Sequence, residues 1–221
     1  MTTYRIVALA SGRGSNVQAL IDAQAAGTLP VDLLAVLSDK PDVIALARAR
    51  DAGIDAIALR PRDYADRSAF DRALFARAAA LHPDLVVLAG YMRVIDGAVV
   101  DAWRGRMINI HPSLLPQYPG LHTHQRALDA GDAVHGASVH FVTAELDGGP
   151  LIAQARLPVL AGDNADSLAA RLLPLEHRLL VATVKLLAQG KIALQGNRVV
   201  CDGHTLAAPL LLGESGGLDR R

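Results

Sequence analysis

The sequence has little that would suit a secreted or a nucleic-acid-binding protein. It contains a single cysteine, Cys201, so an intrachain disulfide is excluded, which fits a reducing compartment. It has no surplus charge either, since 22 lysines and arginines balance 22 aspartates and glutamates. A neutral chain gains no long-range attraction for nucleic acid or an anionic membrane. We therefore expect neither partner, and an anion would have to be held locally by a loop or a helix end.

Long apolar runs are also missing. No stretch approaches the roughly 18 to 20 residues that a helix needs to span a bilayer. The first ten residues have one short apolar run and lack the parts of a signal peptide. The sequence therefore predicts a cytoplasmic protein. Its 51% hydrophobic content is enough for a sizeable core and favours one compact domain.

The first half of the chain alternates short apolar runs with Ala-rich stretches at helical spacing. We expect buried strands at 5–10, 33–37, 56–59, 85–89 and 107–110. Helices are expected between them, at 17–26, 43–52 and 68–81. Continuous apolar strands separated by helices are typical of a parallel sheet covered on both faces, so the predicted fold class is α/β.

The second half is less regular. Residues 111–122 contain three prolines and a glycine and are expected to form a shaped loop. Strands are predicted at 136–143 and 151–157, a long helix at 167–189, and a hairpin at 191–202. Pro174 should kink or interrupt the helix. The domain is predicted to cover 1–205, and the tail at 206–221, which ends polar and Gly-rich, is expected to be disordered.

Residues 11–16, Ser-Gly-Arg-Gly-Ser-Asn, join the first predicted strand to the first predicted helix. Two glycines allow a sharp turn, and its amides, with the positive end of the helix dipole, favour a phosphate. A dinucleotide fingerprint would need a third glycine where Val17 stands, and a P-loop would need Gly-Lys-Ser/Thr. The loop therefore suits a monophosphate. The alternative is a tight turn with a serine cap.

The segment 107–113, Met-Ile-Asn-Ile-His-Pro-Ser, puts Asn109 and His111 two residues apart at the end of a predicted strand. Such side chains share a face, at the sheet edge where parallel α/β proteins place their active sites. Histidine exchanges protons near neutral pH, and asparagine can donate to a developing oxyanion. Asp147, in a Gly-rich turn, would orient the imidazole if it lay nearby. The three suit acyl transfer, or else are ordinary structural residues.

Two other kinds of site find less support. His111, His122, His124 and His140 could suggest a zinc site, and His122 and His124 form a His-x-His pair, a spacing that zinc sites use. That pair follows a Pro-Gly turn, however, and can equally open a helix. We predict no metal. Cys201 stands beside no histidine or lysine that would activate a thiol, and the Gly-x-Ser-x-Gly elbow of serine hydrolases is absent.

Taken together, these residues resemble the glycinamide ribonucleotide transformylase family of folate-dependent formyltransferases, over roughly residues 4–205. The run Asn-Ile-His-Pro-Ser-Leu-Leu-Pro at 109–116, Tyr-Pro-Gly at 118–120 and Asp-Gly-Gly at 147–149 mark the wider group. The loop at 11–16 is similar to the family's site for the ribose 5-phosphate of the acceptor. Methionyl-tRNA formyltransferases usually carry another first loop and an RNA-binding domain, and formyltetrahydrofolate hydrolases an N-terminal regulatory domain.

The resemblance implies a single Rossmann-like domain with a mostly parallel, seven-stranded sheet and helices on both faces. It implies transfer of the formyl group of the co-substrate 10-formyltetrahydrofolate to the amine of glycinamide ribonucleotide, in purine (IMP) biosynthesis. The partners would then be these small molecules, with a homodimer as one option for assembly.

The resemblance also implies residue roles. His111 would be the catalytic acid/base, Asn109 would hold the formyl oxygen, and Asp147 would raise the pKa of His111. The substrate phosphate would be bound by Gly14, Ser15 and Asn16, and the ribose or amine portion by Glu176. The folate would contact Arg67, Met92, Arg93, Val94, Ile95, Asn109, Thr143, Ala144 and Leu146.

Four positions depart from the family pattern. Arg13 replaces a small or amide residue, and Gln117 a basic one. Leu173 and Pro174 stand where polar residues are expected on the substrate side of the last long helix. A formyltetrahydrofolate hydrolase, a formyltransferase for another amine such as a nucleotide sugar, and a non-catalytic nucleotide-binding module remain as alternatives.

Overall fold

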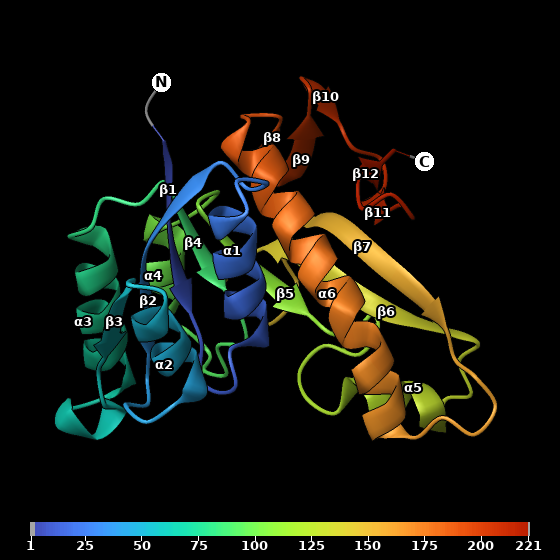
Figure 1. Cartoon of the computed structure of the whole chain (residues 1–221), viewed down its shortest axis with the longest axis horizontal. Helices are drawn as coiled ribbons and strands as arrows, with labels where there is room; N and C mark the ends of the chain where they lie inside the picture. The colour runs from blue at the N-terminus through green and yellow to red at the C-terminus, as the bar shows by residue number, and fades with distance from the viewer. Residues whose placement is uncertain (1–2, 221) are drawn as a thin grey trace. The chain divides into compact units, whose positions relative to one another are not determined.

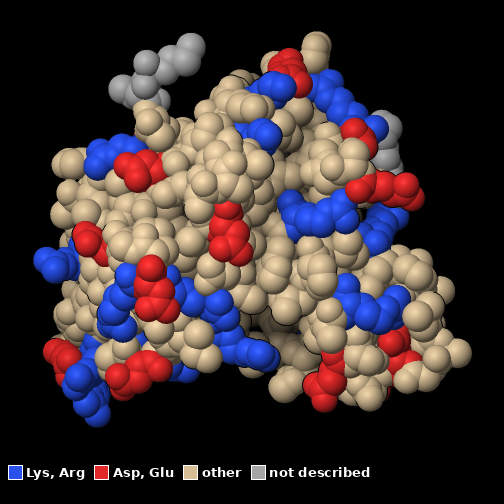
Figure 2. Space-filling view, in the orientation of Figure 1, with Lys and Arg blue, Asp and Glu red and all other residues tan. Residues whose placement is uncertain are grey.

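The structure, a computed structural model, describes residues 3–220 and divides into two compact units, 1–109 and 110–221 (Figure 1). Each unit is described by itself below. Within residues 3–220, none of the helices combines the length and apolar character that crossing a membrane requires. On the face drawn in Figure 2, basic and acidic side chains are interspersed, in keeping with the balanced composition.

The first unit is a parallel sheet with helical connections. Its strands have the order β5-β4-β1-β2-β3, and every neighbouring pair is parallel. The elements are β1 (Tyr4–Leu9), α1 (Ser15–Ala25), β2 (Val31–Ser38), α2 (Ile44–Asp51), β3 (Asp55–Ala58), η1 (Pro61–Asp63), α3 (Arg67–Ala79), β4 (Leu85–Leu88), α4 (Gly97–Ala102) and the start of β5 (Met107–His111). The five predicted strands and three predicted helices are confirmed, while α4 was not predicted.

The apolar runs explain this arrangement. Ile6, Val7, Ala8 and Leu9 are fully buried in β1, and all four residues of β4 are buried. Such strands are shielded on both faces, which right-handed crossover helices between parallel strands accomplish. The carboxyl ends of β1, β2 and β4 therefore open at one edge of the sheet, where loops can gather.

The second unit begins with the end of β5 and is built on an antiparallel pair. Its further elements are α5 (Thr123–Asp129), β6 (Val134–Phe141), β7 (Leu151–Pro158), α6 (Ala165–Ala188), β8 (Ile192–Gln195), β9 (Arg198–Cys201), β10 (His204–Thr205), β11 (Leu210–Leu212) and β12 (Leu218–Asp219). Helix α6 packs on β6 and β7, and Figure 1 shows it as one long orange ribbon. The predicted strands, helix and hairpin are confirmed.

Helix α6 is not interrupted at Pro174, so that alternative in the prediction is wrong. Proline removes the hydrogen bond to the carbonyl four residues earlier, which here belongs to Ala170. Ala170 and Pro174 are both exposed, so water can satisfy this carbonyl. The helix continues because its other face is buried through Leu172, Leu179 and Leu180.

The C-terminal tail differs most from the prediction. Instead of being disordered, it forms β11, which pairs parallel with β7, and β12, which pairs antiparallel with β11. The guanidinium of Arg178 donates to the carbonyls of Gly213 and Glu214, which joins the tail to α6. The seven strands expected correspond to β1–β7, so the predicted number is wrong by the two that the tail adds. The predicted α/β fold class is confirmed, and the limits 1–205 stay a prediction.

Candidate functional site

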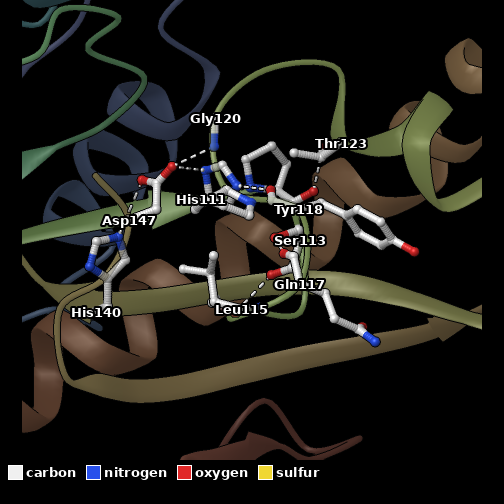
Figure 3. Close-up of polar contacts among 12 residues, drawn as sticks. His111, Ser113, Leu115, Gln117, Tyr118, Gly120, Thr123, His140 and Asp147 are labelled. Carbon is white, nitrogen blue, oxygen red and sulfur yellow. Dashed lines mark hydrogen bonds and ion pairs between the residues drawn. The ribbon is translucent and has the colours of Figure 1, made fainter. Parts of the chain in front are cut away.

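Strand β5 carries both Asn109 and His111, two residues apart, as the sequence predicts. His111 is its last residue and is only 6% exposed, while Asn109 is half-buried. Pro112 follows and ends the strand, since proline cannot continue a ladder of hydrogen bonds. The loop of residues 112–122 then folds around the imidazole (Figure 3).

Asp147 lies between two histidines (Figure 3). Its Oδ2 is 3.5 Å from Nδ1 of His111, and its Oδ1 is 3.7 Å from Nε2 of His140. The backbone amide of Gly120 also donates to Oδ2, at 2.8 Å. All three side chains are at least nine-tenths buried. We call His111, His140 and Asp147 the acid–base cluster. The structure thus brings Asp147 to His111, which the sequence could not establish.

The Asp-Gly-Gly turn places Asp147 for backbone reasons. Asp147 has a φ of 52°, in the left-handed region that aspartate tolerates better than most residues. Gly149 passes so close to β6 that a Cβ atom would lie 1.8 Å from the carbonyl oxygen of Phe141. No side chain can be accommodated there without moving the backbone, so this glycine is required to bring the turn against β6.

Burial and charge oppose one another in the cluster. Burial lowers the pKa of His111, and the Tyr118 carbonyl and the Asp147 carboxylate, which both favour the charged ring, do not fully offset it. Burial raises the pKa of Asp147, but its contact with His140, the Gly120 amide and His111 outweigh burial and lower it. Asp147 thus pulls the pKa of His111 upward, as expected, yet the net shift of His111 is downward. A neutral imidazole beside an ionised carboxylate is the favoured state at neutral pH.

Both ring nitrogens of His111 face acceptors. Nε2 is 2.9 Å from the Tyr118 carbonyl oxygen, and Nδ1 faces the carboxylate. A neutral ring can satisfy one of them and a protonated ring both, so a proton gained during a reaction would be stabilised at once. Because the Tyr118 carbonyl occupies Nε2, a reacting group can use that nitrogen only by displacing the carbonyl.

The first unit holds the other predicted site, which we call the glycine loop (residues 11–16). Gly14 is the N-cap of α1, has a φ of 69°, and offers no side chain to bond the first-turn amides. The start of a helix, where backbone amides point outward at the positive end of the helix dipole, attracts an anion. The loop carbonyls are held on the α2 side, since Gly12 accepts from the Ala45 amide at 3.1 Å and Arg13 from Nε of Arg48 at 3.0 Å. The arrangement suits an anion.

Gly14 cannot be replaced without a clash. A Cβ atom there would lie 2.6 Å from both Cα and Cβ of Ala45. The close approach of the loop to α2 therefore depends on glycine, for packing as well as for its positive φ. Ser15 begins α1, and Asn16 follows with 8% exposure.

The predicted folate residues occur in both units. In the first, the neighbouring apolar side chains of Met92 and Val94 are 66% and 51% exposed, while Ile95 is buried. Arg93 stacks over the ring of Phe70, with Cζ 5.1 Å from its centroid. Exposed apolar side chains next to polar ones are typical of a binding surface. Arg67 is exposed at the start of α3.

In the second unit, the other predicted residues lie in or near the turn that carries Asp147. Leu146 is 57% exposed, Ala144 is exposed and Thr143 is half-buried. Glu176 is 9% exposed within α6, so it is not an ordinary surface residue of that helix. Their roles toward substrates stay predictions.

Sequence reasoning considered His140 only as a possible metal ligand, and it missed the Tyr118 carbonyl. His140 is 2% exposed in β6, and its Nδ1 lies 2.9 Å from the carbonyl oxygen of Phe141, which fixes the ring with Nε2 toward Asp147. A histidine near the end of a predicted strand, seven residues before Asp147, was the signal available. The Tyr118 carbonyl belongs to the backbone, and no residue type announces it.

Of the histidines considered for zinc, His111 and His140 face Asp147, and His124 faces His135, which was not among them. Nδ1 of His124 lies 3.0 Å from Nε2 of His135, with the rings edge to face. Among residues 3–220, no group of three or more His, Cys, Asp or Glu is placed to hold a metal ion. Burial, followed by the neighbouring His124, lowers the pKa of His135 to about 4.

Comparison with known proteins agrees with this geometry. A profile of the formyl transferase family matches residues 4–184. The phosphoribosylglycinamide formyltransferase of Escherichia coli (strain K12) is 48% identical over 201 residues, which cover 91% of this chain and 95% of that protein. The solved phosphoribosylglycinamide formyltransferase of Coxiella burnetii, in complex with CHES, is 40% identical, with a TM-score of 0.91 and full coverage of both chains. A formyltetrahydrofolate deformylase from Pseudomonas putida KT2440 is 29% identical, with a TM-score of 0.80 over 90% of this chain and 70% of that one.

Proposed function

Because the chain belongs to the formyl transferase family, we propose that it transfers the formyl group of 10-formyltetrahydrofolate to the amine of glycinamide ribonucleotide. The observation that carries the proposal is the buried His111–Asp147 pair at the end of the strand that also holds Asn109. The products would be formylglycinamide ribonucleotide and tetrahydrofolate. The enzyme would act as a cytoplasmic step of purine biosynthesis, and a homodimer stays a prediction.

The residues support a direct transfer. The neutral amine attacks the formyl carbon, and the carbonyl oxygen becomes an oxyanion that the Asn109 amide group stabilises, joined by His111 once its ring has taken up the proton of the amine. The nitrogen of the amine loses a proton, and N10 of the folate gains one as the C–N10 bond breaks. His111 carries that proton between the two nitrogens through Nε2, which the substrates reach by displacing the Tyr118 carbonyl, while Asp147 at Nδ1 stabilises the imidazolium.

The acid–base cluster fits this task. A histidine whose pKa is lowered by burial is neutral at the start and can accept the proton of the attacking amine. The carboxylate of Asp147, held ionised by His140 and Gly120, limits the cost of charging the ring. No covalent intermediate with the enzyme is required.

The glycine loop supports the choice of acceptor. Helix α1 begins at the glycine cap Gly14, and the carbonyls of Gly12 and Arg13 in the loop before it accept hydrogen bonds from α2. This arrangement suits the phosphate of a ribose phosphate. Arg13 would add a positive charge beside it. The folate would lie against the exposed Met92 and Val94 and against the turn at 143–147.

The test is to mix purified protein with 10-formyltetrahydrofolate, with and without glycinamide ribonucleotide, and to follow the absorbance change on deformylation. Turnover that requires the ribonucleotide is the expected result. Equal turnover in both mixtures would instead identify a hydrolase, the alternative to which the Pseudomonas putida deformylase draws attention. No turnover from folded protein would reject the proposed acceptor, and the interpretation of the glycine loop would be abandoned first.

A further inference from the structure

Ser11 lies at the junction of three strand ends in the first unit. It follows β1 and is 4% exposed. Its Oγ donates to Oδ1 of Asp39, just after β2, at 2.6 Å. The same Oγ accepts from the backbone amide of Met92, beyond β4, at 3.0 Å. Its own amide donates to the Gly90 carbonyl at 3.0 Å. One small side chain thus joins β1 to segments that follow β2 and β4.

The roles within this arrangement are fixed by chemistry. A serine hydroxyl has one hydrogen to donate and two lone pairs to accept with. The Asp39 carboxylate, 6% exposed, takes that hydrogen, which leaves a lone pair of Oγ for the Met92 amide. Asp39 therefore orients the hydroxyl, and the hydroxyl positions the backbone of Met92.

Both predicted substrate elements begin at this junction. The glycine loop starts at Ser11 itself, and the segment 92–95 starts at the amide that Ser11 binds. The exposed side chains of Met92 and Val94 do not pack into a core that would hold the segment. Arg93, stacked on Phe70, and the buried Ile95 hold the side-chain face of the segment. Its backbone is fixed at its two ends, by Ser11 at the Met92 amide and by Asp71, whose Oδ2 accepts from the Asp96 amide at 2.8 Å.

We propose that Ser11, oriented by Asp39, is a positioning residue that sets the glycine loop and the segment 92–95 in one fixed arrangement, so that acceptor and donor binding both depend on it. The inference rests on the proposed function, which assigns an acceptor phosphate to the loop and the folate to the segment. It adds a residue that contacts neither substrate and couples their two sites within one unit.

The experiment uses the full chain with Ser11→Ala and measures two affinities separately by calorimetry. One ligand is glycinamide ribonucleotide and the other tetrahydrofolate, each in the absence of the other. Removing a hydrogen bond that involves a charged group costs enough to weaken an affinity by about 10- to 100-fold. We expect both dissociation constants to rise within that range, both KM values to follow, and kcat at saturation to stay within about threefold.

Two further variants separate positioning from general stability. Ser167→Ala removes a serine from the capping box of α6 and should lower the melting temperature without changing either dissociation constant. Asp39→Asn keeps an acceptor for the Ser11 hydroxyl and should bind both ligands nearly as the parent does. Asp39→Ala frees the hydroxyl to rotate and should weaken both, which tests the idea even if Ser11→Ala does not fold.

Three results would overturn the proposal: a Ser11→Ala variant that binds both ligands normally, one that weakens only a single ligand, or an equal weakening by Ser167→Ala. Failure of the proposed function is recognised differently, because then the parent protein itself would not turn over the ribonucleotide. In that case inorganic phosphate and tetrahydrofolate replace the substrates as binding probes, and a joint loss in Ser11→Ala still supports the coupling.

Discussion

The glycine loop and the acid–base cluster are built by opposite means. The loop presents backbone amides and depends on what is absent, because Gly14 has no side chain to cap α1 or to meet Ala45. The cluster presents buried side chains whose charges are balanced by one another and by the Gly120 amide. A backbone site tolerates most side-chain changes and fails through shape. A side-chain site fails when one group is deleted, since its partners are left buried without compensation.

The largest effect is expected from His111→Ala. Loss of an acid/base group should lower kcat by about 10²–10⁴-fold, with a smaller change in KM for either substrate. Steady-state kinetics with both substrates checks this, and circular dichroism checks the fold. A variant that retained full kcat would show that proton transfer does not pass through this ring. The acid–base cluster would then not be a site that fails when one side chain is deleted.

Asn109→Ala should come next. Removing an oxyanion donor is expected to lower kcat by about 10²–10³-fold, since the donor acts on charge that exists only in the transition state. Asn109→Asp would be the sharper variant, because it keeps the size and replaces the donor by a negative charge. If KM rose instead while kcat stayed constant, Asn109 would be a binding residue and not part of the chemistry.

The buried histidines of the second unit should make stability depend on pH. The folded-state pKa of His135 is about 4, below its ordinary value of 6.5, so the unfolded chain takes up the proton first as the pH falls. The contribution of neutral His135 to stability is complete above pH 6.5, the ordinary pKa of histidine. It is lost as the pH falls from there toward about 4, the pKa in the folded state. We expect a loss of about 2 kcal/mol in unfolding free energy from pH 7.5 to pH 5.

Urea titrations at both pH values measure this loss, to which the lowered pKa values of His111 and His124 add in the same direction. His135→Gln should reduce this dependence of the unfolding free energy on pH. A substitution of His204, which is exposed in β10, should leave it unaltered. If the unfolding free energy of His135→Gln depended on pH as steeply as that of the parent protein, the effect would belong to other groups.

The glycine loop should be broken by a single methyl group. In Gly14→Ala the new Cβ would meet Ala45 at 2.6 Å, and the left-handed backbone is itself unfavourable for alanine. The loop should shift and KM for the ribonucleotide should rise by about tenfold or more, a cost of about 1.4 kcal/mol.

Gly27→Ala is a matched control for this variant. Gly27 has the same φ of 69°, belongs to the same unit, and would present its Cβ to no atom within 4 Å. It should lose stability through backbone strain without any change in KM. If both variants raised KM alike, strain and not the approach to α2 would explain the result.

The sequence predicts well what is local. The apolar runs identify β1, β2, β4 and β5, and the glycine spacing identifies the loop, because each depends on neighbours in the chain. The approach of Asp147 to His111 depends instead on a turn whose position is fixed by Gly149 meeting β6, which no local pattern encodes. The contacts of His140 with Asp147, and of Ser11 with Asp39 and the Met92 amide, were not predicted for the same reason, since each joins separate segments of the chain. The leucines at 210–212 were a signal for β11 that the polar residues after them obscured.

The way in which Gly14 opens α1 has a consequence for how the protein senses acidity. Backbone amides have no proton to exchange near neutrality, so the glycine loop has no titration of its own. A phosphate monoester does, since its second ionisation lies near pH ~6. Below that value the ligand, and not the loop, would change its charge. The buried imidazoles of the second unit, whose pKa values are lowered, stay neutral to lower pH while the protein is folded. Mild acid would thus reach the folded enzyme first through the protonation of its substrate.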